Sequence, residues 1–140
     1  MIELPDVNVL FALHEPDYES HDAAITWFNS VTYYATTPIT ESGLVRLLMN
    51  PRSGSTEFNA AEAWQALDAI RHGKGATFWS DDIEGVTSNF RYAAYGYRQI
   101  SDLHLLELAK RHNGKLVTFD KRIPAVLRPA DRRFVRVLVT

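Results

Sequence analysis

The stretch that decides the fold is Ser101–Asp120, SDLHLLELAKRHNGKLVTFD, whose pattern predicts a helix, a sharp stop and a strand. Ser101 is suited to the N-cap of the helix, and Gly114 is expected to supply the left-handed residue that ends it. The strand follows after a short turn, at residues 116–119, so it should run back antiparallel to the helix. The far end of the strand then returns to the point where the helix began.

The apolar residues of this helix form one wide stripe, and His104, Glu107 and Arg111 share the opposite face. At the returning end of the strand, Asp102 and Asp120 are expected to lie close together. Two carboxylates at one end of such a unit repel, raise each other's pKa, or need a cation between them. This pair is the first indication of a functional site.

Length and composition limit the classes of protein to consider. The 140 residues suit one domain, 1–140, and can bury a sufficient core without staples. The chain has no cysteine, which excludes disulfides, thiolate metal sites and cysteine nucleophiles. We see no apolar run of membrane-spanning length and no basic leader before an apolar segment, so we expect a cytoplasmic protein.

Charge is divided unevenly along the chain. Residues 1–90 hold 4 Lys and Arg against 13 Asp and Glu, and residues 91–140 hold 11 against 4, so the two parts carry formal charges of -9 and +7. Such a split is typical of two solvated surfaces of opposite sign or of complementary charge within a dimer. It equally suits a basic surface for a polyanion beside an acidic pocket.

The remainder of the chain alternates strands with helices. Apolar and β-branched runs predict strands at residues 2–4, 31–35, 76–79 and 134–139. Helical periodicity predicts helices at residues 7–14, 41–49, 57–71 and 88–97, and another that starts at residue 20. Thr40 is the expected N-cap of the helix at 41–49. A short helix is expected from Asp81, and residues 121–129 are expected to be short or irregular. This alternation indicates an α/β fold, a three-layer sandwich with a mainly parallel central sheet.

Four carboxylates, Asp6, Glu41, Asp102 and Asp120, each fall at a strand C-terminus or a helix N-terminus. In a parallel α/β fold these positions lie at one edge of the sheet, where ligand sites form. Carboxylate oxygens suit Mg²⁺ or Mn²⁺, and a divalent ion held there could bind a phosphate oxygen and activate water for hydrolysis. Each acid taken singly is also what the helix dipole favours at a helix start.

Other candidate residues have ordinary structural interpretations. Asp81 and Asp82 read as helix-start acids, the five histidines have no ligand spacing, and Trp27, Trp64 and Trp79 lie on faces predicted to be buried. Arg46 follows Glu41 by five positions and suits a salt bridge as well as a phosphate contact.

Four successive motifs resemble those of PIN-domain ribonucleases, and most closely the VapC-type toxins of bacterial toxin–antitoxin pairs. They are Asp6-Val7-Asn8-Val9-Leu10, Pro38-Ile39-Thr40-Glu41 with Gly43-Leu44-Val45-Arg46-Leu47-Leu48, Gln99-Ile100-Ser101-Asp102-Leu103-His104-Leu105-Leu106, and Thr118-Phe119-Asp120. They span nearly the whole chain in the order of the family. Pro5 departs from the pattern, because the family commonly has an aliphatic residue there.

The resemblance implies a PIN-like fold in which Asp6, Glu41, Asp102 and Asp120 are the catalytic, metal-binding acids. It implies Asn8 as a support for the first acid and a Mg²⁺- or Mn²⁺-dependent endoribonuclease that a small antitoxin holds inactive. A homodimer is also implied. Lys121 and Arg122, after the last acid, suit RNA phosphates or a solvated turn, and with Arg46 they are the possible RNA contacts.

Two other functions are alternatives to metal-dependent RNA cleavage. A phosphatase with an aspartyl nucleophile at Asp6 would usually have a second acid two residues on, where this chain has Asn8. A non-catalytic PIN-like module would bind RNA or a partner with too few acids close enough to hold a metal. Binding of Mn²⁺ distinguishes this module from the nuclease.

Overall fold

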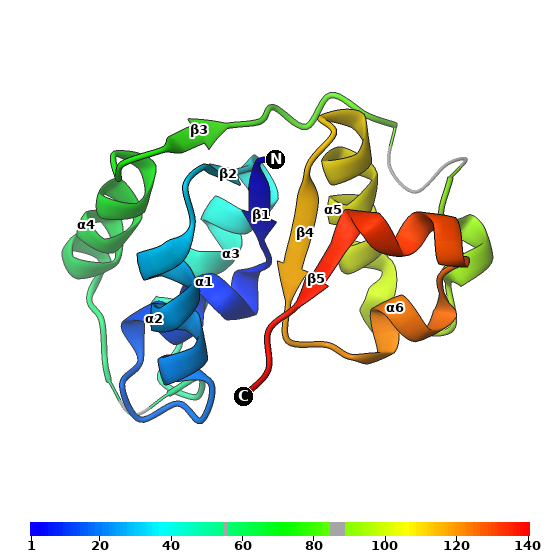
Figure 1. Ribbon diagram of the computed structural model, residues 1–140. Coiled ribbons are helices and arrows are strands. Elements are labelled where there is room, and N and C mark those ends of the chain that lie inside the picture. The colour runs from blue at the N-terminus through cyan, green and yellow to red at the C-terminus, as the bar shows by residue number, and fades with distance from the viewer. Residues whose placement is uncertain (55, 85–88) are drawn as a thin grey trace.

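The central sheet has five parallel strands, in the order β3-β2-β1-β4-β5. The computed structural model describes residues 1–54, 56–84 and 89–140. The strands are β1 Glu3–Pro5, β2 Tyr34–Thr36, β3 Ala76–Phe78, β4 Lys115–Thr118 and β5 Val135–Val137. The order places β1 and β4 side by side at the centre, where the chain changes the direction in which it adds strands (Figure 1). The predicted parallel α/β fold is therefore confirmed.

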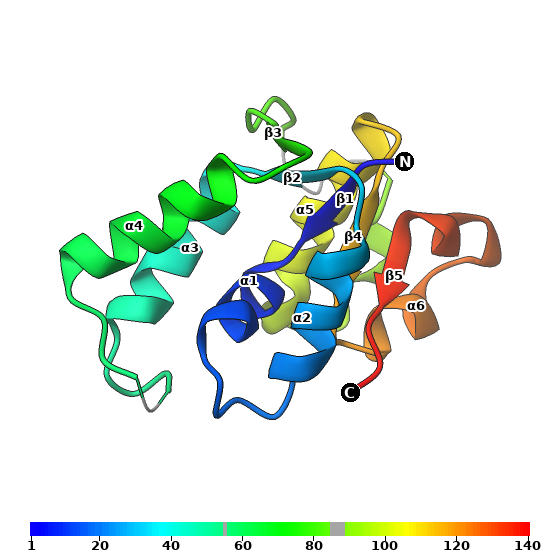
Figure 2. The ribbon, with the colours of Figure 1, turned by 60° about the vertical axis from the view of Figure 1, so that its left-hand side comes forward.

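Helices cover both faces of this sheet (Figures 1 and 2). The α-helices are α1 Val7–His14, α2 His21–Ser30, α3 Pro38–Met49, α4 Ala60–Arg71, α5 Ile100–Arg111 and α6 Arg122–Val126. Short 3₁₀ turns are η1 Arg91–Ala93, η2 Tyr97–Gln99 and η3 Pro129–Phe134. None of the helices in the described ranges is long and apolar enough to cross a membrane.

Alternating strand residues divide the interior into two cores. Tyr34 and Val117 face the core built by α1, α2, α3 and α4. Their neighbours Ala35 and Leu116 face the opposite core, which α5, α6 and η3 complete. Strands that are buried on both faces are typical of a parallel sheet with helices on each side, and they produce the three layers expected from the sequence.

The α5–β4 unit forms as the periodicity predicts, but its ends differ. Helix α5 continues directly from η2, so Gln99 is the N-cap and Ser101 lies inside the first turn. The left-handed residue is Asn113, with φ of 53°, instead of Gly114. Gly114 is required for space, because a Cβ there would collide with the Ile2 carbonyl oxygen and the Trp79 ring.

Side-chain burial on α5 also corrects the sequence analysis. Glu107, predicted on the polar face with His104 and Arg111, is buried. Its carboxylate accepts hydrogen bonds from the Asn89 backbone N–H at 3.0 Å and from Asn89 Nδ2 at 2.9 Å. A buried carboxylate with two donors is satisfied, so Glu107 anchors the segment before η1 to the helix.

Two other helix starts move by a few residues. Thr37 caps α3 in a capping box with Thr40, which is the third helical residue instead of the predicted N-cap. Helix α4 begins at Ala60 after an Asn59 cap, and not at Glu57. Trp64, predicted to face the core, is 54% exposed, because the small residues Ala63 and Ala66 fill the buried face.

The segment after β3 was predicted to be helical and is mostly not. Residues 81–84 form no helix, because Asp81 and Asp82 extend across α5 to ion pairs with His104 at 2.7 Å and Arg111 at 3.1 Å. The predicted helix 88–97 starts at a residue outside the described ranges, and from residue 89 it contains only η1 before Gly96 interrupts it with extended backbone. Segment 121–129, which was predicted to be short or irregular, holds the five-residue helix α6.

Pro5 fits at the centre of the sheet because it ends its strand. Strand β1 pairs with β2 only at Glu3, and with β4 from Glu3 to Pro5. The missing proline N–H therefore falls where β2 no longer needs a donor from β1. The next residue, Asp6, donates its N–H to the Val117 carbonyl at 2.9 Å, which holds the acid at the seam between β1 and β4.

Candidate active site

An open cleft of about 320 Å³ lies at the carboxyl edge of β1 and β4. Three of the four predicted acids line it, together with the predicted supporting residue: Asp6, Asp102, Asp120 and Asn8. Its other lining residues are Tyr18, Ser20, Thr118, Phe119 and Arg122. The cleft is at the switch point of the strand order, which is where ligand sites of open α/β sheets form.

Asp6 is held rigidly as the N-cap of α1. Its Oδ1 accepts a hydrogen bond from the Val9 N–H at 3.0 Å, and the residue is only 4% exposed. Burial raises the pKa of the Asp6 carboxyl, and the hydrogen bonds from Thr118 and Val9 act against this rise. Asp6 is thus both a helix cap and a member of the acidic cleft.

Asp102 enters the cleft from the first turn of α5, the helix that runs back beside β4. Burial, followed by the charges of Asp6 and Asp120, raises the pKa of the Asp102 carboxyl to about 7. Asp102 and Asp120 thus lie in one cleft, as predicted, and the charge of Asp120 disfavours ionisation of Asp102. A group of this kind calls for a proton or a cation near neutral pH.

Asp120 has the opposite electrostatic environment. Arg122 Nε and Nη2 donate to its two carboxylate oxygens at 3.0 and 3.1 Å, and these hydrogen bonds lower the pKa of Asp120. The Asp120 N–H donates to Thr118 Oγ1 at 3.1 Å, so one hydroxyl contacts both Asp120 and Asp6. Thr118 precedes the last acid in the Thr-Phe-Asp motif, but its polar role at a buried strand end was not predicted.

Glu41 is not among the residues that line the cleft. It lies in the first turn of α3, where Oε2 accepts from Thr36 Oγ1 at 2.7 Å and pairs with Arg71 Nε at 3.3 Å. Thr36 ends β2, so Glu41 lies at the same edge of the sheet as the other acids. Its assignment as a fourth ligand stays a prediction.

The predicted basic contacts differ in position. Arg122 lines the cleft, whereas Arg46 is exposed on α3 and Lys121 is exposed just after Asp120. Tyr18 and Ser20 line the cleft from the loop before α2 and were not predicted as site residues. A loop position relative to a distant strand end leaves no periodic signal in a sequence.

The donor set suits a hard divalent cation. All of the acids in the cleft offer carboxylate oxygens, the ligands preferred by Mg²⁺ and Mn²⁺. Burial, and after it the charges of Asp6 and Asp120, raises the pKa of Asp102, so a cation nearby would stabilise its ionised form. Within the described part of the chain, no three acidic or histidine side chains are close enough to hold a metal as they stand. The Arg122 guanidinium pairs with both carboxylate oxygens of Asp120, so it would have to move before a metal could bind them.

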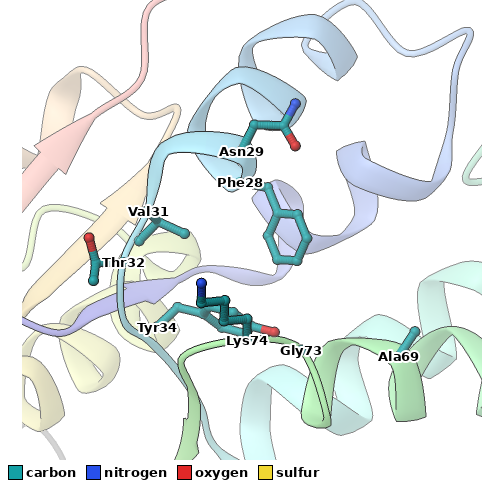
Figure 3. Close-up of a pocket in the computed structure, with 8 residues that line it drawn as sticks. All are labelled: Phe28, Asn29, Val31, Thr32, Tyr34, Ala69, Gly73 and Lys74. Atoms are coloured by element: carbon teal, nitrogen blue, oxygen red, sulfur yellow. The ribbon is translucent and has the colours of Figure 1, made fainter.

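A second, larger cleft lies at the opposite, amino edge of β2 (Figure 3). It has a volume of about 510 Å³, and the Phe28 ring points into it opposite Tyr34 and Lys74. No acidic residue lines it. Its lining has no carboxylate to hold a divalent cation, so the acidic cleft is the candidate site for metal-dependent chemistry.

The fold and the acidic cleft together are typical of one family of proteins. The family model described as the PIN domain matches residues 4–128, and the chain belongs to this family of PIN-domain proteins. Among named relatives it is 42% identical to Ribonuclease VapC39 of Mycobacterium tuberculosis over 124 residues, covering 86% of this chain and 89% of the relative. It is 40% identical to Ribonuclease VapC38 of the same species over 119 residues, covering 84% of each. The resemblance to VapC-type proteins is therefore confirmed.

Solved structures show the same fold at lower identity. The crystal structure of Mycobacterium tuberculosis VapC20, described as a Sarcin-Ricin loop cleaving toxin, matches with a TM-score of 0.60 and 17% identity, covering 91% of this chain and 99% of that one. VapBC2 from Rickettsia felis, bound to a DNA fragment from their promoter, matches with a TM-score of 0.57 and 15% identity, covering 99% and 100%.

Proposed function

We propose that this protein is an endoribonuclease toxin that hydrolyses RNA phosphodiester bonds in its acidic cleft, with Mg²⁺ or Mn²⁺ as cofactor. The observation that carries the proposal is the convergence of Asp6, Asp102 and Asp120 from three separate segments on one open cleft. Their mutual repulsion is maintained within a well-packed fold, as expected for a functional site. The relatives named ribonucleases support the choice of reaction.

Asp6, Asp102 and Asp120 would hold the metal, and Glu41 would join them on release from Arg71. When bound, the ion would lower the pKa of a water and neutralise charge on the phosphate. Asp6 is already oriented by the α1 cap and by Thr118, so little ordering remains for the first ligand. Asn8, which also lines this cleft, would support Asp6.

We propose that Arg122 leaves the Asp120 carboxylate and binds a phosphate of the RNA. In the structure its guanidinium binds Asp120 in a bidentate pair, and its side chain is 67% exposed. A substrate phosphate presents the same planar pair of oxygens to a guanidinium. We infer that Arg122 would contact an RNA phosphate when its pair with Asp120 opens, and that Lys121 would add positive charge beside it.

We also propose that a small antitoxin holds the enzyme inactive, and that the toxin forms a homodimer in the cytoplasm. The VapBC2 structure supports a partner protein for chains of this fold. Co-expression with the product of a short neighbouring reading frame, followed by purification on a tag carried by that product, tests the partner. Recovery of the toxin in an inactive complex is the expected result.

Cleavage of RNA by purified protein tests the enzyme. The wild type should cut RNA with Mn²⁺ or Mg²⁺ and lose this activity in excess EDTA, whereas Asp6→Asn should cut nothing. Asp68 is an exposed acid on α4 that does not line the cleft. Asp68→Asn is therefore the matched control and should remain active. Wild-type cleavage that persists in EDTA would contradict the metal-dependent mechanism.

A non-catalytic PIN-like module is the second candidate function. It is favoured by the two arginines, Arg122 and Arg71, that neutralise Asp120 and Glu41 in the structure. Calorimetric titration with Mn²⁺ separates the two functions. Heat of binding that disappears in Asp102→Asn supports the nuclease, and its absence in the wild type, with RNA binding intact, supports the module.

A further inference from the structure

An exposed run of aromatic and basic side chains meets the acidic cleft through Arg122. We call it the Tyr–Arg surface, and it consists of Tyr95, Tyr97, Arg98 and Arg122. Tyr95 is 44% exposed and Tyr97 is 81% exposed. The guanidinium carbon of Arg122 lies 6.0 Å from the centroid of the Tyr95 ring, and that of Arg98 lies 5.6 Å from the Tyr97 ring. Two adjacent tyrosines thus each carry a cation over an accessible ring.

Arg122 joins this surface to the cleft. The same side chain lines the cleft, binds Asp120 and lies over Tyr95. The pKa of the Tyr95 phenol is raised by its partial burial and then by the charges of Asp120 and Asp102. Tyr95 therefore lies within the electric field of the acids, and a chain that leaves the cleft past Arg122 meets its ring.

Structural duties explain a third tyrosine of this segment but not Tyr95 and Tyr97. The Tyr92 hydroxyl donates to Asp131 Oδ2 at 2.5 Å and accepts from the Arg128 N–H at 3.0 Å, so Tyr92 ties η1 to η3. Tyr97 contacts its own neighbour, Arg98, whose Nε donates to the Tyr97 hydroxyl at 3.2 Å. Large rings left in solvent beside an ionic cleft are typical of a binding surface.

We propose, resting on the ribonuclease function above, that the Tyr–Arg surface binds unpaired nucleotides of the RNA next to the phosphate in the cleft. An unpaired base stacks on Tyr95, the next base reaches Tyr97, and Arg122 and Arg98 contact the intervening phosphates. Single-stranded nucleic acids are bound by this combination of aromatic platforms and basic groups. A base inside a duplex has both faces covered by its neighbours and cannot use the platform.

The positive charge of this part of the chain suits a polyanion, and its continuity with the cleft favours RNA over an acidic protein segment as the occupant. Residues 91–140 carry 11 Lys and Arg against 4 Asp and Glu, and two of these four acids belong to the cleft itself. Phosphates spaced along a strand suit guanidinium groups spaced along a segment. Continuity with the reaction cleft through Arg122 requires an occupant whose backbone also enters that cleft, and the RNA substrate meets this requirement.

The inference is tested by the binding of a labelled single-stranded RNA of about ten nucleotides, measured by fluorescence anisotropy. All variants carry Asp6→Asn, so that the RNA is not cut. Tyr95→Leu should weaken binding about tenfold, because it removes the ring on which one base stacks. Tyr95→Phe keeps the ring and should stay within about twofold of its parent. Tyr33→Leu, at a 57% exposed tyrosine before β2, is the matched control and should bind like its parent.

Annealing the RNA to its complement gives a second, independent readout. The duplex should bind about tenfold more weakly than the single strand, and the Tyr95→Leu change should no longer matter. If Tyr95→Leu is well folded by circular dichroism and binds single-stranded RNA like its parent, the inference is overturned. Loss of antitoxin binding in Tyr95→Leu with RNA binding unchanged would also overturn it, because the surface would then bind protein.

Cleavage assays with Asp6 intact separate this inference from the function on which it rests. If the wild type cuts RNA and Tyr95→Leu cuts it with an unchanged KM, the nuclease stands and the Tyr–Arg surface does not bind substrate. A raised KM with kcat largely retained supports the surface. If the wild type cuts no RNA under any metal condition, the nuclease fails whatever the anisotropy of the Tyr95 variants.

Discussion

At Asp102 the proposed metal-binding role opposes the stability of the fold. Burial and the charges of Asp6 and Asp120 raise its pKa to about 7, so its ionised form destabilises the metal-free fold. Asp120 avoids this cost through Arg122, and Asp6 reduces it through Thr118 and the α1 cap. One uncompensated carboxylate in an otherwise satisfied cluster is the local conflict expected where a cation binds.

The pH dependence of stability tests this electrostatic account. The unfolded chain loses the Asp102 proton near pH 4 and the folded protein loses it near 7, so the stabilisation from the bound proton is lost as pH rises through this window. In EDTA, Asp102→Asn should remove that loss and be more stable than the wild type at pH 8 by about 2 kcal/mol. The two should differ little at pH 4, as measured by urea unfolding. Equal wild-type and variant profiles would contradict the account.

Asp6 caps α1 and is proposed to bind the metal, and substitution can separate these two roles. Asn is as good an N-cap as Asp, whereas Ala is not. Asp6→Asn and Asp6→Ala should both be inactive, but only Asp6→Ala should lose about 1 kcal/mol of unfolding free energy through the missing hydrogen bond to Val9. Parallel cleavage and urea titrations measure both effects. A catalytically active Asp6→Asn protein would show that the cap is the only role of this residue.

Among the elements, periodicity predicted α5 and β4 and, through them, the proximity of Asp102 and Asp120. It did not predict the ends of α5, because the preceding η2 turn and the close approach of Ile2 and Trp79 are set by distant parts of the chain. The aromatic spacing of residues 89–97 imitates a helical face, yet Phe90 and Ala93 are buried while Tyr92 and Tyr95 remain accessible. The Arg71 partner of Glu41, thirty positions on, has no local signal.

The end of α5 offers a matched pair of substitutions. Gly114→Ala should destabilise the fold by about 2 kcal/mol or more, because the added methyl meets the Ile2 carbonyl and the Trp79 ring. Asn113→Gly should be neutral or slightly stabilising, because Asn113 already has φ of 53°. Urea unfolding measures both. If Asn113→Gly were the more damaging change, Gly114 would not be the constrained position.

At the scale of the whole molecule, the charge division follows the sheet. Residues 1–90 contribute β1, β2, β3 and α1–α4, whereas residues 91–140 contribute α5, β4, α6 and β5 (Figure 1). The strand order places the boundary between β1 and β4, so the acidic cleft opens where the acidic and basic parts meet. An RNA strand can then be attracted by one part while its scissile phosphate reaches the carboxylates of the seam.

This arrangement predicts binding that depends strongly on salt. The affinity of the cleavage-deficient Asp6→Asn protein for RNA should fall about tenfold or more between about 50 and 200 mM KCl. The reason is that phosphates bound by the protein release their counterions. Arg122→Gln should reduce the slope of log affinity against log salt by about 0.7. Anisotropy titrations give both values. An affinity that is independent of salt would contradict binding through the basic part.

The central claim is that Asp6, Asp102 and Asp120 form the reaction centre of a ribonuclease. Its most direct test is to express the wild type and Asp6→Asn at equal levels in bacterial cells and to sequence the new RNA 5′ ends. The account predicts discrete new ends with the wild type and none with Asp6→Asn. The same ends with both proteins, or no new ends with soluble, folded wild type, would contradict it.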